Sequence, residues 1–413
     1  MSVEVFFSYS HKDEDLRDEL EKHLKLLQRQ GKIDAWYDRD IEAGAERLPE
    51  IQQHLNQADI ILLLVSADFL ASDYCYDVEV KRAMERHEAR EARVIPVILR
   101  PVDWQDAPFG QLKPLPTDGQ PIAKWANQDE ALLNVAQGIK HTLQEVAAAR
   151  AEFKTNLYSA LLKLGFQQQA ELFLRAIDAE SVAAFLIHGG SPEYGQRWLL
   201  NRLVVEYVPL HTVSKVVTID LSRTARRKDV SAYWRELGKR LNLKLSEINA
   251  IAVADGVYRW WLTQDVIFVF HDVNLMPESS LVNLIEQFWL PLTQRVQMAE
   301  AGESDRKLLM FFVDYEGKAE QWQLPWVEKL DASWDPRKPI KPPKLQEFTD
   351  QEVMSWIVSQ FRDLPPVLTQ GIDEQVNEIL ALTDQGVPDL VLQEICERCG
   401  FDWYEELDKW LKY

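Results

Sequence analysis

Apolar and polar positions alternate regularly along the first 150 residues. Short apolar runs typical of strands occupy residues 3–7, 33–37, 60–65 and 94–99, and residues 122–125 are predicted to form a fifth strand. The run at 60–65 (IILLLV) has no polar residue, which indicates a strand buried on both faces. Helical spacing separates the runs, as in Leu16, Leu20, Leu24 and Leu27. The pattern predicts a five-stranded parallel sheet between helices.

A second set of strand and helix patterns follows. Apolar runs at residues 184–188, 215–219, 266–270 and 308–313 predict four more strands, with predicted helices at 198–206, 232–241 and 281–290. A proline-rich stretch at residues 336–343 is predicted to end this sheet, and the chain from residue 350 onward is predicted to be helical. We therefore expect an α/β domain at residues 1–148, a second α/β domain at 149–345 and a helical region at 346–413.

Composition limits the classes of partner. The net charge of −20 is shared by both halves of the chain, which argues against nucleic acid as a partner. No apolar stretch approaches 18 residues and no secretory signal is evident, so we expect no membrane span and a cytoplasmic location. Three cysteines fit a reducing compartment. Cys396 and Cys399 lack two further zinc ligands nearby, so we expect no metal.

Five ordered segments in the first 104 residues carry a family resemblance. They are residues 6–13 (FFSYSHKD), 36–44 (WYDRDIEAG), 58–66 (ADIILLLVS), 72–79 (SDYCYDVE) and 95–104 (IPVILRPVDW). In this order they resemble the TIR family, in particular its bacterial branch. The resemblance implies a flavodoxin-like parallel sheet. It also implies a function, because many bacterial and plant TIR domains cleave the nicotinamide–ribose bond of NAD+.

The resemblance places the family's catalytic carboxylate at Glu79, with NAD+ as substrate and no separate cofactor. This chemistry is sensible, since nicotinamide leaves as a neutral ring and the remaining ribosyl centre is oxocarbenium-like. A fixed carboxylate can stabilise that positive charge. Taken alone, Glu79 would be a solvated helix residue favoured by the helix dipole. Asp77 is expected to face elsewhere, because residues two apart do not share a helix face.

Further contacts to the nucleotide are implied by the same resemblance. The residues concerned are Ser8, Tyr9, Ser10, Trp36, Asp38, Arg39 and Trp104. In the family, a Trp at the position of Trp104 stacks on substrate across a contact between two TIR domains, so the site would combine Glu79 of one subunit with Trp104 of another. Trp104 has an alternative role as a hydrophobe over the strand end. Ala43 stands where bacterial relatives usually have Pro, whose ring fixes φ. This departure bears on the assembly contact made by the loop more than on the catalytic role of Glu79.

Residues 185–198 (FLIHGGSPEYGQRW) have the layout of a phosphate-binding strand, turn and helix. The Lys and Ser/Thr of an active motif are replaced by Gln196 and Arg197, which lose the phosphate-binding charge and the metal ligand. This half resembles the inactive branch of STAND-type NTPases, a degenerate P-loop-type fold. The helix start at Gly195 could bind an anion, but a purely structural turn is the favoured interpretation.

These patterns support one function and two alternatives. The first is an NAD+ hydrolase that self-associates through its TIR and C-terminal regions in response to an unknown trigger ligand or phage component, in bacterial antiphage defence. The alternative is a non-catalytic TIR adaptor that acts through homotypic contacts. A third, an ATPase switch, is disfavoured by the missing Lys.

Replacing Gln196 with Ala is expected to leave NAD+ cleavage intact, because no phosphate chemistry is assigned to this side chain. The measurement is nicotinamide release with and without ATP. A strong dependence on ATP that disappears in the variant would contradict this interpretation of the second half.

Overall fold

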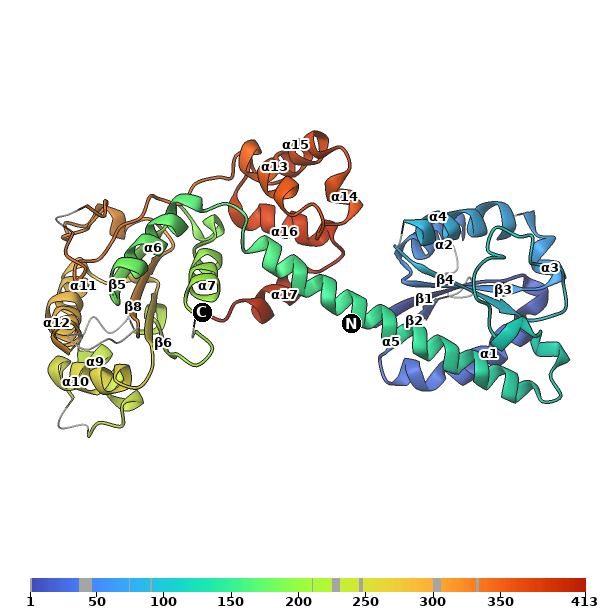
Figure 1. Ribbon diagram of the computed structural model, residues 1–413, viewed down its shortest axis with the longest axis horizontal. Coiled ribbons are helices and arrows are strands. Elements are labelled where there is room, and N and C mark those ends of the chain that lie inside the picture. The colour runs from blue at the N-terminus through green and yellow to red at the C-terminus, as the bar shows by residue number, and fades with distance from the viewer. Residues whose placement is uncertain are drawn as a thin grey trace. The chain divides into compact units, whose positions relative to one another are not determined.

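The computed structural model describes every residue except 1, 37–46, 74, 90, 210, 225–230, 245–247, 300–305 and 332–333. The chain divides into two compact units, residues 1–153 and 154–413 (Figure 1). The long helix α5, Gln128–Leu161, continues through this boundary. Division into three domains at 148/149 and 345/346 stays a prediction.

The first unit is built on a parallel sheet of strand order β2-β1-β3-β4. Its strands are β1 Val3–Ser8, β2 Ile33–Trp36, β3 Ile60–Val65 and β4 Arg93–Ile98. Every residue of β3 is fully buried, as its unbroken apolar run predicts. Because all four strands run parallel, their carboxyl ends meet at one edge of the sheet.

Helices cover both faces of this sheet (Figure 1). The helices α1 (Glu14–Arg29) and α5 pack on one face, and α2 (Arg47–Gln57) and α4 (Lys81–Glu88) pack on the other. The shorter elements of the unit are η1 His11–Asp13, α3 Ala67–Leu70, the π-helical turn η3 Cys75–Val80, and the 3-10 turns η4 Thr117–Gly119 and η5 Ile122–Lys124.

The predicted fifth strand at residues 122–125 is wrong, and the described residues of this sheet form four strands. The segment instead forms the 3-10 turn η5, closed by hydrogen bonds from Lys124 N to Pro121 O (2.9 Å) and from Trp125 N to Ile122 O (3.1 Å). Pro121 has no amide hydrogen for a strand ladder. Beside β4, Leu115 makes an isolated parallel bridge to Val97. Ile122 is still fully buried, so its apolar character reflects the core.

The second unit contains a parallel sheet of order β5-β8-β7-β6. The strands are β5 Val182–His188, β6 Lys215–Asp220, β7 Val266–His271 and β8 Leu308–Asp314, which confirms the four predicted strands. The main helices around them are α6 Gln167–Ala179, α7 Gln196–Tyr207, α9 Ser231–Arg240, α10 Ala250–Trp261, α11 Glu278–Leu284 and α12 Leu290–Ala299, with the π-helical turn η10 Ile285–Trp289 between the last two.

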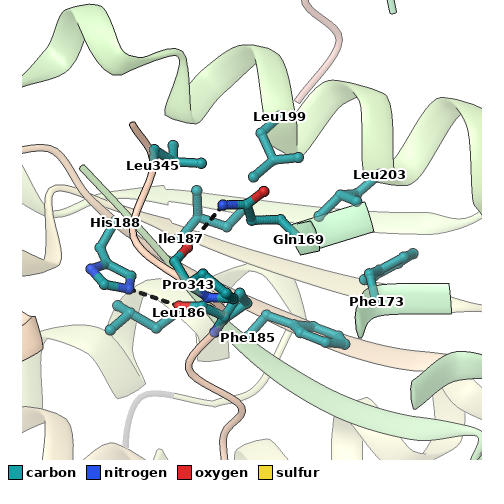
Figure 2. Close-up of a pocket in the computed structure, with 11 residues that line it drawn as sticks. Gln169, Phe173, Phe185, Leu186, Ile187, His188, Leu199, Leu203, Pro343 and Leu345 are labelled. Carbon is teal, nitrogen blue, oxygen red and sulfur yellow. Dashed lines mark hydrogen bonds between the residues drawn. The ribbon is translucent and has the colours of Figure 1, made fainter. Parts of the chain in front are cut away.

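Short elements complete this part of the unit: η6 Pro192–Tyr194, α8 Leu221–Thr224, η9 Val273–Leu275 and η11 Ala319–Gln321. The proline-rich stretch runs along the outer edge of β5. Ile340 exchanges backbone hydrogen bonds with Ala184 (2.8 Å) and Leu186 (2.9 Å). Figure 2 shows the small cavity behind it, where His188 Nε2 lies 3.0 Å from the carbonyl of Pro342 and Gln169 Nε2 donates to that of Pro343.

The C-terminal region is helical, as predicted. Its helices are α13 Asp350–Ser359, α14 Pro366–Thr369, α15 Ile372–Leu382, α16 Pro388–Arg398 and α17 Trp403–Trp410. Trp403 and Trp410 pack on Trp198 of α7 with ring centroids 5.4 and 6.2 Å apart. Across the described ranges, no helix is long and apolar enough to cross a membrane.

Replacing Leu24 with Ala is expected to destabilise the first unit by about 2–5 kcal/mol, because this side chain is fully buried between α1 and the sheet. Leu26 of the same helix is 64% exposed and provides a matched control, so its change to Ala is expected to shift stability by no more than about 0.5 kcal/mol. The stability change of each variant is measured by urea unfolding of the full chain, with hydrogen exchange of the β1 and β3 amides as the signal for the first unit. Equal effects at the two positions would contradict the packing of α1.

Candidate functional site

Two side chains from distant parts of the sequence meet at the carboxyl edge of the first sheet. Ser8 is the last residue of β1, and Glu79 lies in the π-helical turn η3. The hydroxyl of Ser8 donates a hydrogen bond to a carboxylate oxygen of Glu79. Both side chains are buried, and Glu79 has 6% of its surface exposed. A buried carboxylate costs free energy unless it accepts hydrogen bonds, so this contact helps to hold Glu79 in place.

The turn η3 separates its two acidic residues. Cys75 and Val80, near its ends, pack into the core on the α2–α4 face. Glu79 is buried beside them, whereas Asp77 is exposed, as expected for residues two apart. Glu79 is therefore not the solvated helix residue that its sequence position alone suggests. Isolated π-helical turns are rare and occur frequently at functional sites.

An ion-pair network joins the segments that follow three of the strands. The buried carboxylate of Asp13 accepts hydrogen bonds from Ser66 and from the guanidinium of Arg100. Arg100 also donates to Asp68 (2.7 Å), and Lys12 donates to the other oxygen of Asp68 (2.9 Å). The hydrogen bond from Lys12, followed by that from Arg100, lowers the pKa of Asp68. The network thereby fixes the loops after β1, β3 and β4 relative to one another.

Asp13, Ser66 and Arg100 were not predicted from the sequence as parts of this edge. A signal for them was present. Ser66 and Arg100 directly follow predicted strands, and the carboxyl ends of parallel strands share one edge. The pairing of Arg100 with Asp13 spans 87 positions, however, so no local pattern indicates it.

The loop after β1 also contacts the turn that carries Glu79. The Sγ atom of Cys75 donates to the carbonyl oxygen of Tyr9 at 3.5 Å. The ring of Tyr9 is buried, and the guanidinium of Arg17 lies 5.1 Å from its centroid. Ser10 is half-buried and precedes η1. The structure thus brings the predicted loop after β1 together with Glu79, although the role of Tyr9 and Ser10 in binding NAD+ stays a prediction.

Trp36 takes part in a different contact. Its ring stacks on those of Phe6 (5.5 Å between centroids) and His54 (4.2 Å). The half-buried Trp36 lines a hollow on the β1–β2 side of the unit together with Glu4 and Asp34. The ring is therefore engaged inside its own unit. Of the other predicted contacts at the end of β2, Asp38, Arg39 and the loop with Ala43 lie outside the described residues.

Trp104 is half-buried and packs against the core on the α2–α4 face. A Cβ added to Gly119, whose φ is +67°, would lie 3.1 Å from the ring of Trp104, so the ring is seated close to this turn. This packing fits the alternative of a hydrophobe that covers the strand end. The ring is partly exposed, and its contact with substrate on a neighbouring subunit stays a prediction.

Among the described residues, no three or more His, Cys, Asp or Glu side chains are grouped so that they could hold a metal ion. Cys396 and Cys399 are free thiols. Burial raises the pKa of each to about 12.

The degenerate phosphate turn of the second unit connects β5 to α7. Gln196 is fully buried, and its Nε2 donates to the carbonyl oxygens of Ser191 (2.9 Å) and Asp314 (3.4 Å). Arg197 is exposed. In an active motif these two positions hold the side chains that bind phosphate and magnesium. Here the side chain of Gln196 is directed into the protein. Arg197 cannot ligate a metal, because a guanidinium group has no acceptor atom.

Comparison with known proteins matches two parts of the chain. Residues 5–133 match the model of the TIR domain, and residues 161–313 match the model called inactive STAND. The chain is also 58% identical over 142 residues to the uncharacterized protein y4lF of Sinorhizobium fredii. That alignment covers 34% of this chain and 44% of y4lF, so the chain spans less than half the length of this relative.

A comparison of structures pairs the chain with the crystal structure of NtrX from Brucella abortus, at 14% identity. The match covers 99% of this chain and 91% of that one, and its TM-score of 0.23 is too low to indicate a shared fold. The two family matches agree with the two parallel sheets and with the residues that suggested them in the sequence. The chain carries a TIR domain at residues 5–133 followed by an inactive STAND domain at residues 161–313.

Proposed function

We propose that the TIR domain hydrolyses NAD+ to nicotinamide and ADP-ribose or a cyclic variant, with Glu79 as the catalytic carboxylate. The observation that carries the proposal is the buried Glu79, held by Ser8 at the carboxyl edge of a parallel sheet. Open α/β sheets bind ligands outside this edge. Asp77, in the same turn, is exposed and so lacks the burial that holds Glu79 in place.

In the hydrolytic reaction, the bond between the ribose C1′ and the nicotinamide nitrogen breaks, and its electron pair goes to the ring. Water then adds to C1′ and releases a proton. Positive charge develops on the ribosyl centre, and a carboxylate fixed beside it stabilises that charge without reorganisation. In this proposal Glu79 supplies the charge, and the Ser8 hydrogen bond and the Asp13–Arg100 network fix its position.

Self-association is the second part of the proposal. TIR domains commonly form homotypic contacts, and Trp104 retains an exposed portion at the surface of its unit. A site completed by Trp104 of a neighbouring subunit would be inactive in the monomer. The inactive STAND domain and the helical region would then act as the sensor that assembles TIR domains on a trigger, in a defence response. The alternative is a TIR adaptor without catalytic activity.

Replacing Glu79 with Gln is expected to lower the rate of nicotinamide release by about 10²- to 10³-fold, because the variant keeps the shape and loses the charge. The matched control is Asp77→Asn, which removes the same charge from an exposed position of the same turn and is expected to retain activity. Purified full-length protein is incubated with NAD+, alone and in crowded solution that favours assembly. No release by the unmodified protein in any assembled form would support the adaptor.

Mixing two inactive variants tests the composite site. Glu79→Gln and Trp104→Ala are each expected to lose activity, and an equal mixture should recover about one quarter of the native rate, since one pair in four combines an intact Glu79 with an intact Trp104 across a head-to-tail contact. Hydrogen exchange of β3 amides checks that Trp104→Ala remains folded. Full activity of Trp104→Ala alone, or a mixture without activity, would rule out the shared site and leave the role of Glu79 intact.

A further inference from the structure

The vestigial phosphate turn is filled by the chain's own side chain. Gln196 has no exposed surface, and a Cβ added to Gly189 would lie 2.6 Å from its Nε2 atom. The amide of Gln196 therefore lies against the glycine at the start of the turn. It also donates to the carbonyl oxygen of Ser191 within the turn. A phosphate cannot enter this space unless the side chain leaves.

Two backbone positions of the turn supply no free amide hydrogen for a phosphate. Phosphate-binding turns hold their ligand through successive N–H groups directed into the loop. Pro192 has no amide hydrogen. The amide of Tyr194 donates to the carbonyl oxygen of Ser191 at 3.2 Å, which closes the turn as the 3-10 element η6. These two positions therefore offer no amide hydrogen to a ligand.

The mouth of the turn is covered by residues from the C-terminal helical region. Gly195 adopts φ of +79°, and a Cβ there would meet Phe166 at 2.9 Å, Pro388 at 3.3 Å and the Oδ1 atom of Asp389 at 3.4 Å. Pro388 and Asp389 form the first turn of α16. Burial raises the pKa of Asp389 to about 7, and the charge of Arg197 acts in the opposite direction, so a carboxyl group lies within electrostatic reach of this guanidinium.

Two further contacts hold the helical region against the same element. The hydroxyl of Tyr194, inside the turn, donates to Glu347 at 2.6 Å. Trp198, one helical turn after Gly195, packs on Trp403 and Trp410 of α17. The helical region therefore lies against α7 both at its N-cap residue, Gly195, and along its side at Trp198.

We propose that the C-terminal helical region is the resident ligand of the inactive STAND turn. Pro388 and Asp389 of α16 occupy its mouth, Gln196 occupies its interior, and Trp403 and Trp410 clamp the helix that follows. Gln196 fills the turn and Pro388 and Asp389 cover it, so a trigger for this protein acts by displacing the helical region from α7 and not by nucleotide exchange. The inference concerns residues 154–413 and stands independently of NAD+ cleavage.

Hydrogen exchange on the full chain tests this contact between the C-terminal helical region and α7. Asp389→Arg is expected to speed exchange of the first-turn amides of α7 and α16 about tenfold, because the new cation faces Arg197 and no longer fits over Gly195. Its matched control is Asp373→Arg, which makes the same charge change at an exposed first-turn position of α15 and is expected to leave these amides unchanged. Trp410→Ala is expected to act like Asp389→Arg, and Tyr404→Ala, at a 68% exposed position of α17, is its control.

Fast exchange of the β5 and β8 amides would show that a variant has unfolded the second unit. The test then rests on whichever of Asp389→Arg and Trp410→Ala remains folded. Adding millimolar Mg·ATP or Mg·ADP to the unmodified protein is expected to leave exchange of residues 189–199 unchanged. Slower exchange with nucleotide would overturn the proposal, since it would show that the turn still accepts phosphate. Unchanged exchange in both folded variants, Asp389→Arg and Trp410→Ala, would overturn it as well.

Discussion

A carboxylate buried in a protein needs groups that donate hydrogen bonds to it, and this requirement organises the carboxyl edge of the TIR domain. Glu79 is buried because Cys75 and Val80 anchor its turn in the core, and Ser8 donates to it from the end of β1. Asp13, in the loop after β1, is also buried and accepts hydrogen bonds from Ser66 and Arg100. The loops that follow three strands are thereby tied together, which is the preorganisation that stabilising a developing charge demands.

The carboxyl edges of the two parallel sheets differ in what occupies them. In the TIR domain, the edge displays a positioned carboxylate whose hydrogen bond comes from another strand. In the inactive STAND domain, the corresponding turn is filled by Gln196 and covered by Pro388 and Asp389. One edge holds a buried, hydrogen-bonded carboxylate, and the other is covered by a segment of its own chain.

Much of the fold was predictable because most of its strands are buried on both faces and form apolar runs in the sequence, as in β3, β5, β7 and β8. Residues 122–125 form a 3-10 turn in which only Ile122 is buried, and an apolar residue at the start of so short a segment does not distinguish a strand from a turn. Glu79 was identified through a family resemblance. Its bond to Ser8, 71 positions away, and the filling of the turn by Gln196 depend on tertiary packing, which no local pattern encodes.

The most direct measurement of the central claim is a structure of the assembled protein with a non-hydrolysable NAD+ analogue bound. If Glu79 is the catalytic carboxylate, it lies within hydrogen-bond reach of the ribose that carries nicotinamide, at the carboxyl edge of the β2-β1-β3-β4 sheet. An analogue bound elsewhere, with the Ser8–Glu79 pair still buried and out of contact with it, would contradict the account.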